Sequence, residues 1–538
     1  MTFNAENNHK KQKIFYYLLF STLILWWSGL FGADLYALPS LVLIIYLFYL
    51  IHKGFFPEIF SSSMKTLYQW SVSKKGIKCF LIVFFIQGLI WIVYPVLKYY
   101  SFNLFTLDAG YHSNILYNIS KGDFYSSIFN MQSLGEHFTF SMSFISLFYL
   151  LVPSINWMMG FKVIAYLISV VFIWMLCREW IKDKNKAIFF SILLSLGWLF
   201  FYRPVVNSIR YEFQASCLAP PFIFAAFFCL SKKHILFFVL TLFLLGFKEH
   251  LGAVPIGFGL WYVLRNPQKK LGYFLIIMGI LSIYLLMFEL KPFFRESTIK
   301  YNDINMLDPF KDFGSKIIYF FGYLLLPIFF IPLLFPKNGI LAGPAIGINL
   351  ISGYSPMYSS HYHYDDVSST LLLIATIVSL GSIKLHKFEL WLKQKKTLQI
   401  FLVVWFMFFL VLLPYSSLRF IKDVIPEAIH QEIINEIRQF DEYASGRQIA
   451  VQDVLGPHFY RKEIQVFYSG TDCTEGNTFY QGLLPHGLPH YQFLVLAPDV
   501  SHWGIDDMEK CLKDLDQDPN YQMIDGYRKL IIFHRLSG

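Results

Sequence analysis

Ionisable side chains that could carry chemistry gather in four short segments, and each segment lies beside long apolar runs. Carboxylates, histidines, lysines and arginines are the groups that move protons, bind anions or ligate metal ions. Their clustering predicts a polar site at the edge of an otherwise apolar protein. In chain order the candidates are Asp108, His112, Glu136, His137, Arg203, Arg210, Lys248, Glu249, His361, His363, Asp365 and Asp366.

Asp108 stands in the turn Leu107-Asp108-Ala109-Gly110, after an apolar run and before an apolar-periodic stretch over 111–119. As a helix N-cap it would be structural, because Asp accepts hydrogen bonds from free amides at the positive helix end. As a general base it would take a proton from a substrate hydroxyl. The position alone favours the cap, and both interpretations stay open at this point.

Several cations sit at the ends of apolar runs. Arg203 and Arg210 lie in FYRPVVNSIRYEFQ, and Lys248-Glu249 forms a tight turn between the apolar runs 234–247 and 251–264. Ionisable groups at membrane depth are costly and are usually paired or functional. The alternatives are a simple Lys–Glu pair and side chains that extend to the interface.

The segment SGYSPMYSSHYHYDDVSS contains His361, His363, Asp365 and Asp366. Two histidines at alternate positions followed by two aspartates could ligate a divalent cation. Tyrosine-rich interfacial loops with polar residues are also common in membrane proteins. A divalent cation is therefore one interpretation of this loop, and no cofactor is firmly indicated.

Composition decides the class of protein. The chain has 538 residues, of which 55% are hydrophobic and 15% charged, against about 25% charged in soluble domains. A soluble enzyme cannot bury so much apolar surface, and a disordered chain would not carry it. There is no P-loop, no nucleophile elbow and no basic–aromatic patch, so nucleotide-driven transport, lipase chemistry and nucleic-acid binding lose support. We expect a polytopic helical membrane protein whose partner is the lipid bilayer.

Apolar runs bounded by charge or turn residues predict about thirteen transmembrane helices, since a crossing needs about 20 apolar residues. The runs are 14–31, 39–51, 79–97, 158–177, 187–202, 216–231, 234–247, 251–264, 271–290, 316–335, 339–351, 368–383 and 397–415. A cleavable signal peptide is the alternative for the first run, but its cleavage site is poor.

The run 138–153 decides the orientation. If it crossed the membrane, the basic cluster at 178–186 and all later ones would lie outside, against the positive-inside rule. We therefore expect 138–153 to be an interfacial or re-entrant segment. The prediction is a multi-pass protein of the cytoplasmic membrane, with the N-terminus inside and the C-terminal segment outside.

The chain after residue 415 has a different pattern. A helix is predicted over 424–444, strands over 448–452, 464–468, 492–498 and 529–535, and a solvated helix over 506–518. This indicates a small extracytoplasmic α/β domain over 416–538. The remaining parts are an N-terminal two-helix extension with its cytoplasmic loop (1–78) and a main membrane domain (79–415) with an outer loop over 98–137. Cys473 and Cys511 could form one disulfide outside the cell.

The ordered motifs resemble the GT-C superfamily of membrane glycosyltransferases, and more closely an uncharacterised prokaryotic membrane-protein family near it. The resemblance runs over about residues 80–535. Two positions depart from that family's pattern: Ala109 stands where Leu is usual and His112 near an expected Gln. The motifs are Leu107-Asp108-Ala109-Gly110, Leu134-Gly135-Glu136-His137-Phe138, Lys248-Glu249, His361-Tyr362 and Pro457-His458-Phe459-Tyr460-Arg461.

The resemblance implies a GT-C-like membrane domain that transfers a sugar from a polyprenyl-phosphate donor to an envelope acceptor on the outer face. Asp108 would be the general base. The donor phosphate would bind Lys248, Arg203, Arg210, His361 and His363. Glu249 would orient Lys248, with His112, Glu136, His137 and Asp365 in support.

Two other functions stay open. The same charges could line the path of a transporter or flippase for a polyprenyl-linked or amphipathic substrate. The protein could also be a non-catalytic envelope assembly factor whose outer domain binds partners.

Overall fold

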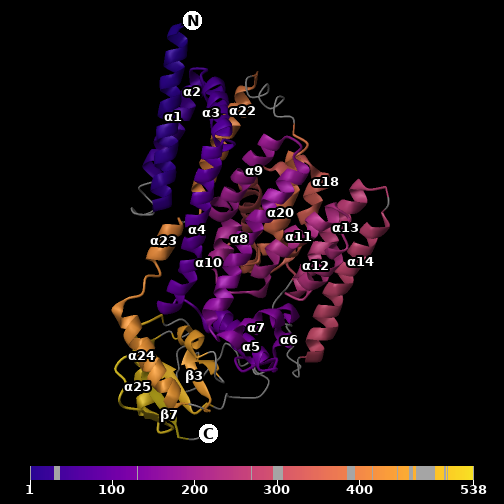
Figure 1. Cartoon of the computed structure of the whole chain (residues 1–538). Helices are drawn as coiled ribbons and strands as arrows, with labels where there is room; N and C mark the ends of the chain where they lie inside the picture. The colour runs from indigo at the N-terminus through magenta and orange to yellow at the C-terminus, as the bar shows by residue number, and fades with distance from the viewer. Residues whose placement is uncertain are drawn as a thin grey trace.

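The computed structural model describes residues 2–28, 37–129, 131–267, 269–294, 307–383, 394–414, 416–444, 446–459, 464–467, 491–501, 505 and 507–536. The main part is a bundle of helices, and a small sheet domain lies at its lower end in Figure 1. The N-terminus is at the opposite end of the molecule from the C-terminus.

The membrane part contains α-helices and short π- or 3-10 helices, the latter two marked η. In chain order they are α1 (Thr2–Ser28), α2 (Ala37–His52), α3 (Phe56–Ser71), α4 (Lys74–Tyr100), η1 (Thr106–Gly110), α5 (Tyr111–Ser120), α6 (Ser133–Glu136), η2 (Phe140–Met142), α7 (Ser143–Leu151), α8 (Ile155–Trp180), α9 (Lys184–Leu196), η3 (Gly197–Phe201), α10 (Arg203–Arg210), η4 (Ala215–Leu218), α11 (Ala219–Ser231), α12 (Leu236–Leu245), η5 (Glu249–Gly252), α13 (Ala253–Arg265), α14 (Lys270–Tyr284), η6 (Leu285–Leu290), α15 (Lys291–Phe294), α16 (Phe313–Ile317), η7 (Ile318–Leu325), η8 (Leu326–Ile328), α17 (Ile331–Leu334), α18 (Pro336–Gly339), η9 (Ile340–Ala342), α19 (Gly343–Ile351), η10 (Ser355–Tyr358), α20 (Asp366–Leu380) and α22 (Lys396–Val411). A two-stranded ribbon, β1 (Tyr125–Ser126) and β2 (Met131–Gln132), lies in the first long loop.

Four of the described helices are long and apolar enough to cross a membrane, namely α4, α8, Lys184–Phe201 and Lys270–Phe294. A fifth crossing results if Arg203–Arg210 and Ala215–Ser231, which are bent by 118°, form one broken span. Shorter apolar helices of 10–17 residues, such as Asp366–Leu380 and Lys396–Val411, complete the bundle. Each predicted apolar run overlaps a described helix, and the number of thirteen crossings stays a prediction.

The segment predicted not to cross forms η2 and α7, which together cover Phe140–Leu151. Twelve residues of helix reach only about 18 Å, less than the bilayer core of about 30 Å. Met142 and Tyr149 are buried against the protein, while Phe144, Leu147 and Leu151 are exposed. This two-sided pattern is typical of a helix in the membrane interface, and that location stays a prediction.

Capping side chains and large buried rings define the centre of the bundle. The side chain of Ser154 accepts a hydrogen bond from Asn156 N at the start of α8, and Ser73 does the same for Gly76 N at the start of α4. Trp91, Trp198 and Tyr166 are fully buried between these helices. Such apolar contacts stabilise the bundle and hold its outer loops in place.

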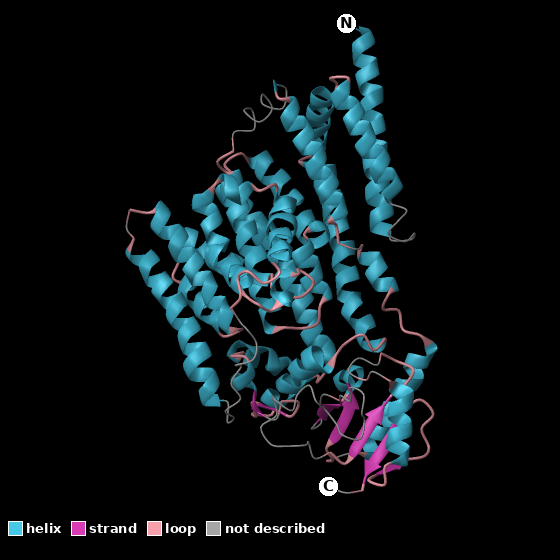
Figure 2. Cartoon of the chain, turned by 180° about the vertical axis from the view of Figure 1, so that it is seen from behind, coloured by secondary structure: helices cyan, strands magenta, loops and turns pink. Residues whose placement is uncertain are grey.

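The small sheet domain is the predicted α/β unit, and Figure 2 shows its strands beside the helices that cover them. It consists of α24 (Ala428–Tyr443), β3 (Ile449–Gln452), η11 (Asp453–His458), β4 (Ile464–Phe467), β5 (Phe493–Leu496), α25 (Met508–Gln517), β6 (Tyr521–Met523) and β7 (Ile531–Arg535). The helix α23 (Ser417–Lys422) lies within the predicted range 416–538 but packs against α4 in the bundle. The strand order is β4-β3-β5-β7-β6. β3 is parallel to β4 and β5, whereas β7 is antiparallel to β5 and β6.

Alternate residues of the strands face opposite layers, as period-two geometry requires. Val451 and Val495 pack with α24, while Ala450 and Leu494 pack with α25. The apolar cluster under α24 continues onto α5 through residues such as Ile115. The sheet domain therefore rests directly on the loop that carries Asp108. The disulfide considered for Cys473 and Cys511 involves Cys473, which lies outside the described residues.

Candidate active site

The turn that carries Asp108 is the π-helix η1, and backbone hydrogen bonds to distant carboxylates hold it. Glu212, which follows α10, accepts hydrogen bonds from Phe105 N at 3.0 Å and Ala109 N at 3.1 Å. Asp453 of the sheet domain accepts one from Thr106 N at 3.1 Å. Two distant parts of the chain, around Glu212 and around Asp453, therefore fix the backbone on both sides of Asp108. This role for Glu212 and Asp453 was not predicted from the sequence.

The Asp108 carboxylate is held by two side chains from the segment after α10. Tyr211 donates its hydroxyl to Oδ2 at 2.5 Å, and Gln214 donates its amide to Oδ1. Burial raises the pKa of Asp108, and the hydrogen bonds from Tyr211 and Gln214 oppose that rise. The side chain is only partly exposed. It does not act as a side-chain cap for the helix that follows, so the cap interpretation is wrong for η1 and α5.

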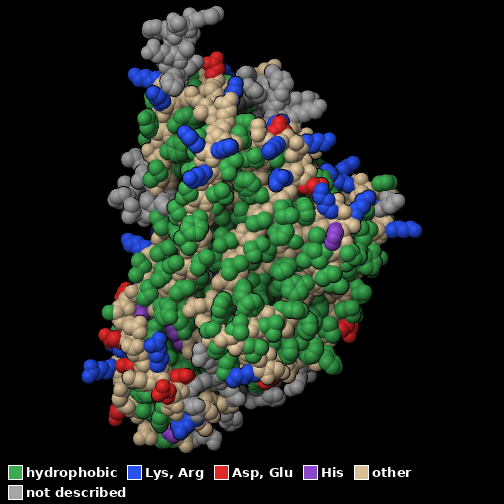
Figure 3. Space-filling model, in the orientation of Figure 1, with side chains coloured by type: hydrophobic (Ala, Val, Ile, Leu, Met, Phe, Trp, Pro, Cys, Tyr) green, Lys and Arg blue, Asp and Glu red, His purple; other side chains and the backbone are tan. Residues whose placement is uncertain are grey.

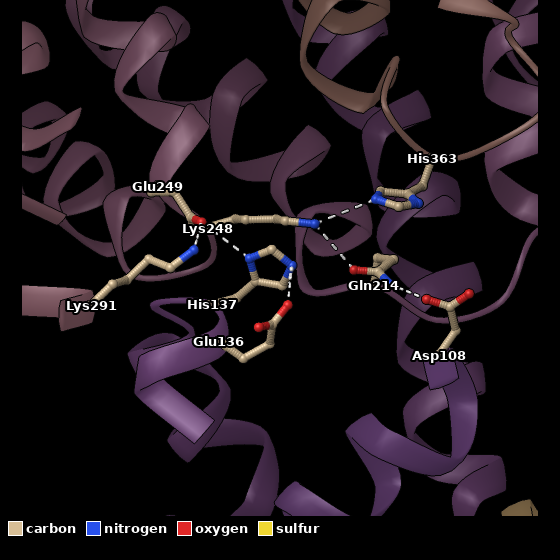
Figure 4. Close-up of polar contacts among 8 residues, drawn as sticks. All are labelled: Asp108, Glu136, His137, Gln214, Lys248, Glu249, Lys291 and His363. Carbon is tan, nitrogen blue, oxygen red and sulfur yellow. Dashed lines mark hydrogen bonds and ion pairs between the residues drawn. The ribbon is translucent and has the colours of Figure 1, made fainter. Parts of the chain in front are cut away.

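Gln214 also connects Asp108 to a buried lysine, as Figure 4 shows. Lys248 Nζ donates to Gln214 Oε1 at 3.2 Å and lies 3.5 Å from His363 Nε2. Burial lowers the pKa of Lys248, while Glu249 and Asp108 raise it. A carboxylate and an ammonium from distant segments thus lie two hydrogen bonds apart.

A second polar group lies next to Lys248 and contains the predicted Glu249, His137 and Glu136 (Figure 4). Glu249 Oε1 is 3.1 Å from His137 Nδ1 and 2.8 Å from Lys291 Nζ, and His137 Nε2 is 3.7 Å from Glu136 Oε1. Burial alone would raise the pKa of Glu249, but His137 and Lys291 hold it well below its ordinary value. Lys291 was not predicted, because nothing in the sequence marks its approach from the start of α15.

The predicted cations do not form one group. Arg203 Nη2 lies 3.4 Å from His361 Nε2, and its guanidinium stacks on Tyr323 at 4.5 Å. Arg210 stacks on Phe420 at 3.5 Å. Arg203 and Arg210 lower the pKa of His361 after the larger effect of burial, whereas Lys248 is the first charge that acts on His363. The five expected phosphate ligands are therefore split between a Lys248–His363 pair and a group of Arg203, Arg210 and His361.

His112, Asp365 and Asp366 contact residues other than those that the sequence predicted. His112 is buried beside Phe213, with ring centroids 5.3 Å apart, and burial lowers its pKa to about 3. Asp365 accepts a hydrogen bond from Tyr319 at 2.5 Å, and Asp366 accepts one from Tyr166 at 2.5 Å. Asp365 thus supports the loop and not Lys248.

The metal interpretation of His361, His363, Asp365 and Asp366 is wrong for the described residues, among which no group of three or more His, Cys, Asp or Glu side chains could hold a metal ion. The four side chains contact Arg203, Lys248, Tyr319 and Tyr166 respectively. These four residues are close together in the sequence, but the loop that carries them is irregular, so their side chains point toward different partners.

The described site also contains Tyr211, Gln214 and Lys162, which the sequence did not single out. Lys162 is fully buried in α8 and donates to Tyr211 O at 2.5 Å. A lysine inside an apolar run was the available signal, since a buried charge needs a partner. Tyr211 and Gln214 carry no comparable signal in the sequence.

A family model described as predicted membrane protein (DUF2079) matches residues 98–450, which is more than half of the chain. The chain belongs to the DUF2079 family. The matched range begins at the end of α4, so it contains the Asp108 turn, Lys248 and the histidine loop but not α1–α3. A search of curated proteins finds no match.

The fold of this DUF2079 protein is similar to solved structures of ArnT from Cupriavidus metallidurans. The structure bound to undecaprenyl phosphate has 14% identity and a TM-score of 0.52, with 86% of this chain and 98% of that chain covered. The apo structure has 14% identity and a TM-score of 0.46, with 85% and 98% covered. The first likeness shows a shared fold.

Proposed function

We propose that the chain is a glycosyltransferase that moves a sugar from a polyprenyl-phosphate donor to a hydroxyl of an envelope acceptor. The observation that supports this most directly is the hydrogen-bonded path from Asp108 through Gln214 to Lys248. The path sets a proton acceptor beside a cation at one end of an apolar bundle. The fold it shares with a protein crystallised with undecaprenyl phosphate supports a lipid donor.

In the proposed reaction the acceptor hydroxyl attacks the anomeric carbon while Asp108 takes its proton. The bond between that carbon and the phosphate oxygen breaks, and the electron pair leaves with the polyprenyl phosphate. Lys248 and His363 stabilise the charge on the departing phosphate. A single displacement of this kind inverts the anomeric configuration. Tyr211 and Gln214 keep the carboxylate aimed at the acceptor.

The Arg203, Arg210 and His361 group lies apart from Lys248 and is proposed to bind the donor at a second point. Glu249, His137 and Glu136 keep Lys248 positioned, because they and Lys291 form a connected set of buried charges. We also propose that the end of the bundle that carries Asp108 lies outside the cell. The chain would then cross the cytoplasmic membrane thirteen times, with its N-terminus in the cytoplasm and the sheet domain on the outer face.

The decisive experiment compares Asp108→Asn with Asp123→Asn, an exposed aspartate of the same loop. Purified full-length protein is incubated with radiolabelled polyprenyl-phosphate sugars and a panel of envelope acceptors. We expect Asp108→Asn to lower transfer by about a hundredfold or more with donor binding retained, and Asp123→Asn to match the wild type. Failure of the wild type to transfer any sugar, with labelled lipid moving across vesicles, would support a flippase and refute the proposal.

The orientation has its own test. Single cysteines at the exposed positions Asn103 and Tyr354 should react with an impermeant maleimide on intact cells, and those at Lys75 and Lys182 should not. The reverse pattern would place the site in the cytoplasm.

A further inference from the structure

A hollow of about 350 Å³ opens at the end of the bundle opposite Asp108. It is lined by Trp180, Trp261, Arg265 and Asn266. Trp180 is the last residue of α8, and Trp261 and Arg265 lie in the last turns of α13, so two helix ends form its walls. Figure 1 shows α8 and α13 in the helix bundle, away from the sheet domain.

The side chains around this hollow offer mainly hydrogen-bond donors. The indole Nε1 atoms of Trp180 and Trp261 are buried, and neither has an acceptor among the described residues. Arg265 holds its guanidinium 5.8 Å from the Trp180 ring and 5.5 Å from the Trp261 ring. No Asp or Glu lies within ion-pair distance of Arg265 in the described part of the chain. Asn266 uses its amide group on Tyr262 O at 3.2 Å.

The geometry of these groups is set before any ligand binds. The two indole rings meet edge to face, with centroids 5.9 Å apart and planes at 77°. Phe227 packs on both of them, at 6.1 Å and 5.0 Å. The nearby Glu179 is already paired with Lys232 and so does not neutralise Arg265. A cation beside two donors without acceptors in the described part of the chain is complementary to a ligand that carries only acceptors, and a phosphodiester is such a ligand.

The location of the hollow points to the source of that ligand. Lys and Arg side chains gather at this end of the molecule, whereas Asp and Glu gather mainly at the other (Figure 3). By the positive-inside rule this end faces the cytoplasm. Tryptophan and arginine at a helix end then stand at the level of the phospholipid headgroups.

We propose that the hollow formed by Trp180, Trp261 and Arg265 binds the phosphate of an anionic phospholipid of the cytoplasmic leaflet. The lipid phosphate accepts hydrogen bonds from the two indoles and pairs with the guanidinium, and its acyl chains lie along the apolar surfaces of α13 and α14. This site is separate from the Asp108 site and does not depend on sugar transfer, but it rests on the proposed orientation, with the basic end of the molecule in the cytoplasm.

The test uses the full-length protein in nanodiscs of phosphatidylcholine with increasing phosphatidylglycerol. Arg265→Gln removes the charge from the hollow, and Arg178→Gln removes an exposed arginine of the last turn of α8 that does not line it. We expect phosphatidylglycerol to raise the melting temperature of the wild type and of Arg178→Gln. The fraction of phosphatidylglycerol that gives half of the full shift should be about fivefold higher for Arg265→Gln than for the wild type. This factor is the effect of about one basic side chain near a lipid surface.

A double variant, Trp180→Phe with Trp261→Phe, keeps the rings and removes both N–H donors. It should weaken phosphatidylglycerol binding, counted by native mass spectrometry, and leave binding of phosphatidylcholine unchanged. Equal binding of phosphatidylglycerol by Arg265→Gln and Arg178→Gln would overturn the proposal. So would equal binding of the two lipids by the wild type, or loss of bound phosphatidylglycerol on addition of inorganic phosphate, which would identify a site for the free ion.

Discussion

Glu212 offers the sharpest test of how the Asp108 turn is positioned. Its side chain is 2% exposed and is the acceptor for two backbone amides, Phe105 N and Ala109 N. Burial raises the pKa of Glu212 to about 8, and the nearby Lys98 opposes that rise. Burial therefore favours the neutral acid over the carboxylate at this position. We infer that its acceptor oxygen, and not its charge, holds the turn.

Two substitutions separate these effects. Glu212→Gln keeps a carbonyl oxygen and resembles the neutral acid, whereas Glu212→Met keeps the volume and leaves two buried amides without an acceptor. An unpaired buried polar group costs about 1–3 kcal/mol, so we expect Glu212→Met to be less stable than Glu212→Gln by about 2–6 kcal/mol. Glu212→Gln should stay close to the wild type.

The assays are thermal unfolding in detergent and sugar transfer at saturating donor. Transfer should fall at least tenfold in Glu212→Met, because each 1.4 kcal/mol lost in the transition state is tenfold in rate. Donor binding should persist, since Glu212 contacts the turn and not Lys248. If Glu212→Gln were as damaged as Glu212→Met, the charge would be essential and the reasoning refuted. Wild-type behaviour of both would show that the amides find other partners.

The remaining predictions concern the contacts around this turn. Gln214→Leu removes both hydrogen bonds that connect Asp108 to Lys248. Hydrogen bonds to charged groups are worth about 1.5–3 kcal/mol, so the rate of sugar transfer should fall by about 10–100-fold. An unchanged initial rate would exclude a role for this path. Lys291→Gln leaves His137 as the remaining ion-pair partner of Glu249 among the described residues. We expect the free energy of unfolding to fall by about 3 kcal/mol. An unaltered melting temperature would contradict this prediction. Burial raises the pKa of Asp453 to about 7 from 3.8, so this carboxyl stabilises the folded protein fully below about pH 4 and progressively less as the pH rises to about 7. The melting temperature of the wild type relative to Asp453→Asn should therefore decline over that range, and a constant difference would contradict the assignment.

The sequence by itself determined the helical elements and several of the polar candidates. Each apolar run corresponds to described helix, because a run of about 20 apolar residues can satisfy its backbone in lipid only as a helix. The strands β3, β4, β5 and β7 lie where alternation and β-branched residues predicted them, while β6 was missed because it is short and half polar. Asp108, Glu136, His137, Lys248, Glu249 and His363 were singled out by being ionisable at the ends of apolar runs.

Tertiary structure decided which of these residues act together. Gln214, Tyr211 and Lys291 look ordinary in the sequence, yet the bend after α10 and the start of α15 bring them to Asp108 and Glu249. The same packing separates His361 from His363, which stand two residues apart in the chain. Periodicity reports only which face of one element is apolar. Hydrogen bonds between elements depend on where helix ends meet, and that geometry arises only when the whole bundle packs.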